Sequence, residues 1–467
     1  MRRVMPSLLL LVLSTPSFAT FCARDVVPAA TLLVPYVVVK MQGDLPDRTG
    51  ATTILHVTNT GAQAALVELV VWNALGEPAV TITAALSGYD MWTVDFADLL
   101  EGRWSRFDTS VSATAPPNLD KPGGFVRTPF EWGPDGRSSA TYPRPLRAPY
   151  TNPWGRGQAT PGKTSELPGG GCGMPYGDAA GQAVAAVLVD KLQEPLFARE
   201  HRGCGQLVVT RHYNDWLSGL TANPLFFWAT VHLVRACSTL TPADAAFPAQ
   251  IADDRDVLLG EVEYLDPAAG ALELTPAVHL ESASSPSEVA AVSPFEARFG
   301  VEDRREPLPT GFAFHYNNGL YPTSVANSAL MLWKPFGELA ADGDVADCGA
   351  YMYYAWDEDE HVVTRGCSDC MGPSDIDPNL FPLTTQLVPL NWSNFDLPAE
   401  AGWVLLLLPP SYVGFTQDPT PGSSANDAHY QGVAAVRTSV VLSNRVVPAW
   451  TEAAAMGNAQ CPAGGGR

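Results

Sequence analysis

Basic residues are scarce in this sequence. Its 467 residues contain only 28 Lys and Arg against 49 Asp and Glu, so the formal net charge is −21 at pH 7. Such a charge repels a polyanion such as DNA and an anionic membrane surface. We therefore expect no nucleic-acid partner. The hydrophobic fraction of 46% is nevertheless that of a chain that folds around a core.

Long hydrophobic runs are also missing. The sequence opens with two arginines, a short apolar run and the small-residue pattern Ser17-Phe18-Ala19, which is typical of a signal peptide. That run is too short to span a bilayer, and the later apolar run 404–408 ends at two prolines. We expect a signal peptide over 1–19, no transmembrane segment, and a protein that is secreted or at the cell surface, with the periplasm as an alternative.

Cysteine is absent between Cys22 and Cys172, so the N-terminal part of the mature chain must rely on its apolar core. All the cysteines lie after the expected cleavage point, and an even number of them in an exported chain predicts disulfides. The sequence leaves their pairing open. The eight positions are Cys22, Cys172, Cys204, Cys237, Cys348, Cys367, Cys370 and Cys461.

Short runs of β-branched and apolar residues, separated by turn residues, indicate strands. Within 91–96, Trp92, Val94 and Phe96 share one face, which is the period-two pattern of a half-buried strand. The expected N-terminal strands cover 32–39, 52–58, 66–72, 80–86 and 91–96. The expected later strands cover 207–212, 226–236, 257–264, 329–333, 351–356, 403–408 and 433–442.

Between the two groups of strands the composition changes. The segment 115–175 contains 12 Pro and 11 Gly, which predicts an irregular loop or linker. After it, Asp178 is a candidate N-cap for a helix with Val184, Leu188 and Leu192 on one stripe. We predict an all-β fold: two antiparallel, Ig-like β-sandwich units with a long Pro/Gly-rich insertion and one short helix. The expected divisions are a signal peptide (1–19), an N-terminal β-sandwich (20–112), a linker (113–177), a helical segment (178–203), a larger C-terminal β domain (204–461) and a disordered tail (462–467).

The sharpest motif match is misleading. Residues 157–164 fit the phosphate-binding loop G-x-x-x-x-G-K-[ST], but neither a buried strand before them nor a helix after them is expected. The nucleophile and zinc-protease patterns G-x-S-x-G and H-E-x-x-H do not occur. His232 alternates with Thr230 and Val234 in an expected strand, where a hydrogen-bonded imidazole is the simplest interpretation. We therefore assign no catalytic residue.

Acidic residues concentrate in 338–377, which holds 11 Asp and Glu and one Arg. Crowded carboxylates repel one another unless they are solvated or bridged by a hard cation, and Ca²⁺ takes oxygen ligands from flexible loops. The spacing matches no EF-hand, so a solvated acidic face is the simpler alternative. A Cys₃His zinc site and paired catalytic carboxylates are further alternatives. The candidate calcium ligands are Asp342, Asp344, Asp347, Asp357, Glu358, Asp359 and Glu360.

The aromatic run 351–356 alternates over both faces of its expected strand, so part of it faces outward. An outward aromatic surface is a candidate sugar-binding platform, although core packing accounts for most aromatic residues. Polysaccharide or cell-surface components are the expected partners.

Several short stretches together resemble a group of secreted bacterial β-rich proteins with no established activity. They include Leu32-Leu33-Val34-Pro35-Tyr36, Leu86-Ser87-Gly88-Tyr89-Asp90 and Pro378-Asn379-Leu380-Phe381-Pro382-Leu383. The resemblance implies an exported, Ig-like β protein and supplies no site residues. The expected function is non-enzymatic binding or a structural role outside the cell, with calcium as a stabilising ion. The alternative is a secreted carbohydrate-active hydrolase that uses carboxylates within 338–377.

Overall fold

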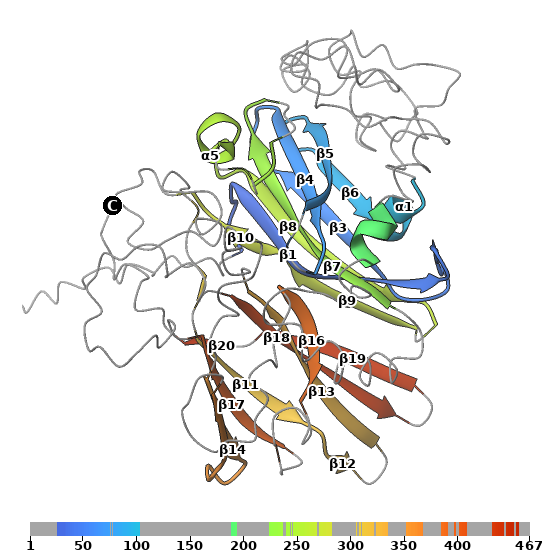
Figure 1. The fold of residues 1–467 in the computed structure, drawn as a ribbon, viewed down its shortest axis with the longest axis vertical. Coiled ribbons are helices and arrows are strands. Elements are labelled where there is room, and N and C mark those ends of the chain that lie inside the picture. The colour runs from blue at the N-terminus through green and yellow to red at the C-terminus, as the bar shows by residue number, and fades with distance from the viewer. Residues whose placement is uncertain are drawn as a thin grey trace, which may run out of the picture.

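A computed structural model describes residues 26–102, 188–193, 224–282, 305–334, 352–367, 384–408 and 432–456, with short gaps inside several of these ranges. The described part is built mostly of antiparallel sheets, which confirms the all-β expectation (Figure 1). None of its helices is long and apolar enough to cross a bilayer. The signal peptide, the linker, the tail and all cysteines except Cys367 on β15 lie outside these residues.

Two sheets share the upper part of Figure 1. The first sheet has the order β10-β1-β7-β4-β5, with β2 paired to β1, and the second has the order β6-β3-β8-β9. Their strands are β1 (Thr31–Gln42), β2 (Leu45–Pro46), β3 (Thr52–Asn59), β4 (Ala65–Trp72), β5 (Pro78–Leu86), β6 (Met91–Asp95), β7 (Pro224–Val234), β8 (Leu258–Asp266), β9 (Ala271–Pro276) and β10 (Val278–Leu280).

Two further sheets share the lower part of Figure 1. The third sheet has the order β15-β14-β17-β11-β20, and the fourth has the order β12-β13-β18-β19, with β16 paired to β13. Their strands are β11 (Gly311–Asn317), β12 (Leu320–Tyr321), β13 (Ser324–Trp333), β14 (Met352–Asp357), β15 (Val362–Cys367), β16 (Thr385–Pro389), β17 (Ala401–Leu407), β18 (Val433–Leu442), β19 (Arg445–Glu452) and β20 (Ala454–Met456).

Burial follows the sequence pattern of each strand. β3 alternates between buried and half-buried residues, as expected for a strand with one face in the core. β4 is buried at every position and β7 at all but its first, because both of their faces are covered. One cover is the segment around α5 (Phe247–Gln250), where Phe247 and Ile251 pack against Leu66 and Val234.

Three short helical pieces are described where one helix was expected. Residues 188–193 are helical, and Leu188 and Leu192 are buried in the core of the first two sheets, as the apolar stripe predicts. α1 (Phe96–Leu100) begins directly after β6, because the Asp95 carboxylate accepts a hydrogen bond from Ala97 N–H at 3.0 Å and caps it. α1 and α5 therefore correct the expectation of one helix.

Strand pairing does not follow the expected division between 20–112 and 204–461. β7 lies between β1 and β4, and β8 lies between β3 and β9, so residues 224–280 complete the sheets of the N-terminal strands. The sequence pattern did not give this pairing, because cross-strand hydrogen bonds join residues that are far apart in the sequence. The core of the first two sheets also continues into the fourth sheet, where Trp333 meets Trp228 edge to face at 5.3 Å.

Candidate functional site

The outer face of the third sheet carries an exposed row of aromatic rings. On β14, Tyr353 and Ala355 are fully buried, whereas the alternate residues Tyr354 and Trp356 are half-buried on the other face. The ring centroids of Tyr354 and Trp356 lie 6.1 Å apart. The sequence expectation that part of this aromatic run faces outward is confirmed.

Strand register extends this row across two neighbouring strands. Trp356 on β14 is opposite Trp403 on β17, and Trp403 is opposite His315 on β11. Trp403 is 50% exposed, and its ring meets the His315 ring edge to face at 5.0 Å. We call Tyr354, Trp356, Trp403 and His315 the aromatic row. It forms an open surface on which an apolar ligand face can lie.

An acidic turn borders the aromatic row. The acidic turn (residues 357–360) begins at the last residue of β14 and leads towards β15, and Glu358, Asp359 and Glu360 are exposed. Asp357 Oδ1 accepts hydrogen bonds from the backbone N–H groups of Asp359 at 3.0 Å and His361 at 2.9 Å. The bond from His361 N–H is the largest cause that lowers the pKa of Asp357 below its ordinary value. The Asp357 carboxylate therefore holds the turn together.

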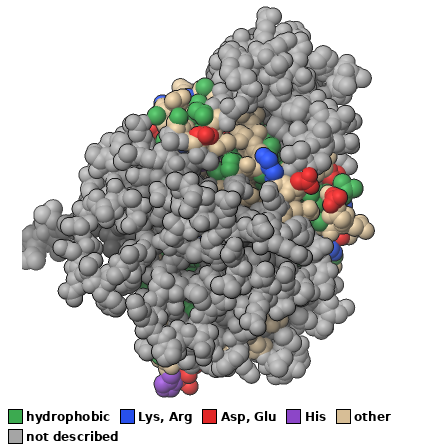
Figure 2. Space-filling view, in the orientation of Figure 1, with side chains coloured by type: hydrophobic (Ala, Val, Ile, Leu, Met, Phe, Trp, Pro, Cys, Tyr) green, Lys and Arg blue, Asp and Glu red, His purple; other side chains and the backbone are tan. Residues whose placement is uncertain are grey.

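One contact between side chains connects the turn to the row. Glu358 Oε1 lies 2.7 Å from His315 Nε2. In Figure 2, histidine and acidic side chains appear together at the lower tip of the molecule, where Figure 1 places the turn end of β14. Hydrogen-bond acceptors and aromatic faces therefore share one surface.

Gly402 allows β14 and β17 to approach beneath the row. A Cβ atom at this position would lie 2.0 Å from the carbonyl oxygen of Trp356 and 3.0 Å from the Tyr316 hydroxyl. Burial, followed by the charges of Asp357 and Glu358, raises the pKa of Tyr316 to about 12. The Tyr316 hydroxyl therefore stays neutral under the acidic turn.

The predicted calcium ligands are only partly within the described residues. Asp342, Asp344 and Asp347 lie outside them, whereas Asp357, Glu358, Asp359 and Glu360 form the acidic turn. Across the described ranges, no group of three or more His, Cys, Asp or Glu side chains is arranged to hold a metal ion. The calcium prediction is therefore untested, and the turn would need ligands from 342–347.

A histidine on the second sheet contacts a hydroxyl and a carboxylate, as the histidine of a catalytic triad does. His56 Nδ1 lies 3.0 Å from Thr93 Oγ1, and its Nε2 lies 3.2 Å from Glu263 Oε2. The three residues are neighbours on three adjacent strands, where Thr93 is directly opposite His56 in the β3–β6 ladder. A nucleophile also needs donors aimed at the oxyanion that forms. We interpret this trio as cross-strand hydrogen bonding on a sheet face.

His232 is a buried, hydrogen-bonded imidazole, as the sequence predicted. It lies 3.1 Å from Thr31 Oγ1 and 2.8 Å from Thr230 Oγ1. Sequence reasoning missed Trp403 and His315 as members of an exposed surface. The alternation of Trp403, Leu405 and Leu407 with buried residues was a signal for the outward direction, but only strand register reveals the partners of Trp403.

No protein-family model, curated protein or solved structure matches this chain.

Proposed function

We propose that this protein is an exported, non-enzymatic β-sandwich protein that binds polysaccharide outside the cell or at the cell surface through the aromatic row. The observation that carries the proposal is the alignment of Trp356, Trp403 and His315 on three adjacent strands, with half of Trp403 exposed. Exposed aromatic surface rimmed by polar groups marks binding sites. Sugar rings suit such a surface because they have apolar C–H faces and hydroxyl edges.

The acidic turn supports sugars over anionic partners. Carboxylates accept hydrogen bonds from hydroxyl groups, and Glu358 and Asp359 present theirs beside the aromatic row. The net charge of −21 disfavours acidic polysaccharides. The expected ligand is therefore a neutral polysaccharide.

Our proposal includes an Ig-like sandwich architecture for each pair of sheets. Its support is that the strands within each sheet are antiparallel and that the two sheets of each pair share a hydrophobic core. Export rests on the signal peptide expected over 1–19.

Affinity electrophoresis in neutral glucan, mannan and xylan gels tests the binding proposal. The wild-type protein should be retarded by at least one of them, and Trp403→Ala should abolish the retardation with an unchanged thermal midpoint. Leu274→Ala is a matched control, because Leu274 is 66% exposed on the second sheet. Retardation that survives Trp403→Ala contradicts the proposed site.

The alternative function is a polysaccharide hydrolase that uses carboxylates of 338–377. A glycosidase needs two carboxyl groups on opposite sides of the scissile bond. Asp357 instead holds two backbone N–H groups of the turn, and Glu358 is paired with His315, which favours binding over hydrolysis. Reducing-sugar release that disappears in Asp357→Asn and Glu358→Gln would favour hydrolysis over binding alone.

Calcium stabilisation is the remaining part of the proposal. An ion that binds only the folded state raises the thermal midpoint by mass action. We expect a rise of several degrees in millimolar Ca²⁺ relative to EDTA, lost in Asp342→Asn/Asp344→Asn. An unchanged midpoint would indicate that these carboxylates bind no calcium and are solvated.

A further inference from the structure

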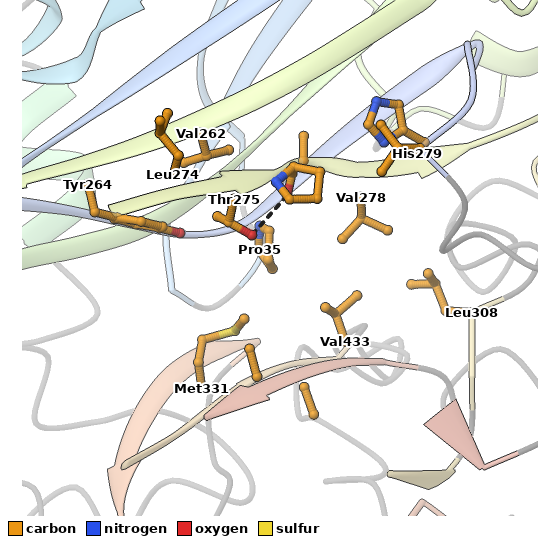
Figure 3. A pocket seen from close by; sticks show the side chains of 15 residues that line it. Pro35, Val262, Tyr264, Leu274, Thr275, Val278, His279, Leu308, Met331 and Val433 are labelled. Carbon is orange, nitrogen blue, oxygen red and sulfur yellow. Dashed lines mark hydrogen bonds between the residues drawn. The ribbon is translucent and has the colours of Figure 1, made fainter. Parts of the chain in front are cut away.

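A cavity of about 90 Å³ lies where the first two sheets meet the fourth (Figure 3). In Figure 3, Tyr264 of β8 and Thr275 of β9 lie on the upper side of the cavity. Met331 of β13 and Val433 of β18 face it from below, and Leu308 lies at one side. The cavity is therefore separate from the aromatic row.

Polar groups in the wall are already hydrogen-bonded. The Tyr264 hydroxyl donates to the backbone carbonyl of Tyr36 at 2.8 Å, and His279 Nε2 accepts from Gly260 N–H at 3.1 Å. Burial lowers the pKa of His279, so its imidazole is neutral. A water in the cavity would therefore find few free partners, which favours an apolar ligand.

We infer that this cavity binds the end of an unbranched, uncharged alkyl chain. Apolar cavities of about 150 Å³ hold benzene, so the smaller volume here suits a chain better than a ring. One large hydrophobic residue of the lining, Val26, is 63% exposed. It marks the open side, where the next methylene groups of a bound chain would cover it.

The net charge of the protein bears on the head group of the ligand, at the end of the alkyl chain that lies outside the cavity. A net charge of −21 disfavours a carboxylate or phosphate head group near the surface. An alcohol or ester head group carries no such cost. The expected ligand class is therefore a neutral alkyl alcohol or ester.

The probe for the test is 1-hexanol. With the methionine methyl groups labelled with ¹³C, the Met331 signal, identified by its loss in Met331→Leu, should shift and saturate with 1-hexanol. Hexanoate and cyclohexanol should bind at least about tenfold more weakly. Absence of a saturable Met331 shift, or a preference for cyclohexanol, overturns the inference.

Two variants change the cavity in opposite directions. Ala435→Leu fills it and should abolish the 1-hexanol shift, whereas Ala313→Leu, on the half-buried outer face of β11, should not. Met331→Ala enlarges it, so cyclohexanol should now raise the thermal midpoint. Met331→Ala still tests the inference if Ala435→Leu fails to fold. A thermal midpoint of Met331→Ala that cyclohexanol does not raise contradicts the inference.

Two further outcomes distinguish alkyl binding in the cavity from sugar binding at the aromatic row and from self-association. Trp403→Ala should bind 1-hexanol normally, so failure of the polysaccharide proposal leaves the cavity proposal standing. A dimer in sedimentation that 1-hexanol does not compete with would assign Val26 to self-association and overturn the inference.

Discussion

Glu68 on β4 is directly opposite His232 on β7, and both side chains are buried, at 0% and 2% exposure. Arg305 Nε donates to Thr31 Oγ1 at 2.6 Å, and the same hydroxyl oxygen lies 3.1 Å from His232 Nδ1. His232 Nε2 lies 2.8 Å from Thr230 Oγ1, so both ring nitrogens have a hydroxyl partner. Burial, followed by the charge of Arg305, lowers the pKa of His232, so it is neutral.

Glu68 has no such arrangement. Neither of its carboxyl oxygens has a hydrogen-bond partner among the described residues. Burial, followed by the charge of Asp244, raises its pKa from 4.5 to about 8. Glu68 is therefore protonated in the folded protein at neutral pH, beside a neutral histidine.

Glu68→Gln should make stability less sensitive to pH. In the wild type, the unfolded chain loses this proton above its ordinary pKa of 4.5, but the folded chain keeps it up to about pH 8. Stability therefore falls as pH rises through this window, by at most roughly 5 kcal/mol at about 1.4 kcal/mol per pKa unit. Urea unfolding at pH 5 and pH 8 should show a smaller loss for Glu68→Gln.

The control for this experiment is Glu261→Gln, at an exposed position on β8. It should follow the wild-type pH dependence. An identical pH dependence for the wild type and Glu68→Gln would show that Glu68 is ionised in the folded state.

Arg305→Met should destabilise the fold by about 2–4 kcal/mol. The guanidinium is 2% exposed and contacts Asp254 Oδ1 at 3.0 Å as well as Thr31, so its removal leaves buried polar groups without their donor. Arg235→Met is a matched control. Arg235 is 3.4 Å from the same Asp254, but its side chain is 51% exposed, and a pair of this kind contributes at most about 1 kcal/mol. Equal unfolding free energies for the two variants would contradict the anchoring role of Arg305.

Local sequence pattern predicted several strands well. The expected strand 433–442 coincides with β18, and the burial of Trp92, Val94 and Phe96 follows the predicted face. Long-range pairing was not predictable in the same way. Nothing in residues 224–234 indicates that they lie between β1 and β4, because this position depends on tertiary hydrogen bonds.

The candidate site shows the same limit. The outward direction of Trp356 follows from alternation within one strand, but its neighbour Trp403 follows only from the β14–β17 register. Glu68 has a sequence signal, because it is a lone carboxylate within the apolar run of β4.

Gly402→Ala should weaken both the fold and polysaccharide binding. Its methyl group would lie 2.0 Å from the Trp356 carbonyl, so β14 and β17 must separate, at a cost of about 1–3 kcal/mol or more. Trp403→Ala, in the next residue, should lower binding alone because Trp403 is 50% exposed. Unfolding and affinity measured on both variants separate the two effects. An unchanged stability in Gly402→Ala would contradict the close approach.

Asp357→Ala should loosen the acidic turn, whereas Asp357→Asn should keep it at neutral pH. An asparagine side-chain oxygen can still accept the N–H groups of Asp359 and His361, and an alanine cannot. Amide hydrogen exchange of these two N–H groups should accelerate in Asp357→Ala. Glu360, which has a left-handed φ of 63° in this turn, should lose its order as well.

The pH dependence of the turn follows from the lowered pKa of Asp357. The folded carboxylate is favoured, so its stabilising effect is present above the ordinary pKa of 3.8 and is lost as pH falls through the lower folded value. Amide exchange at His361, corrected for intrinsic rates, should show reduced protection at acid pH in the wild type. Asp357→Asn should show no such loss, because its amide does not titrate in this range. A parallel loss in both proteins would mean that a group other than Asp357 controls the turn.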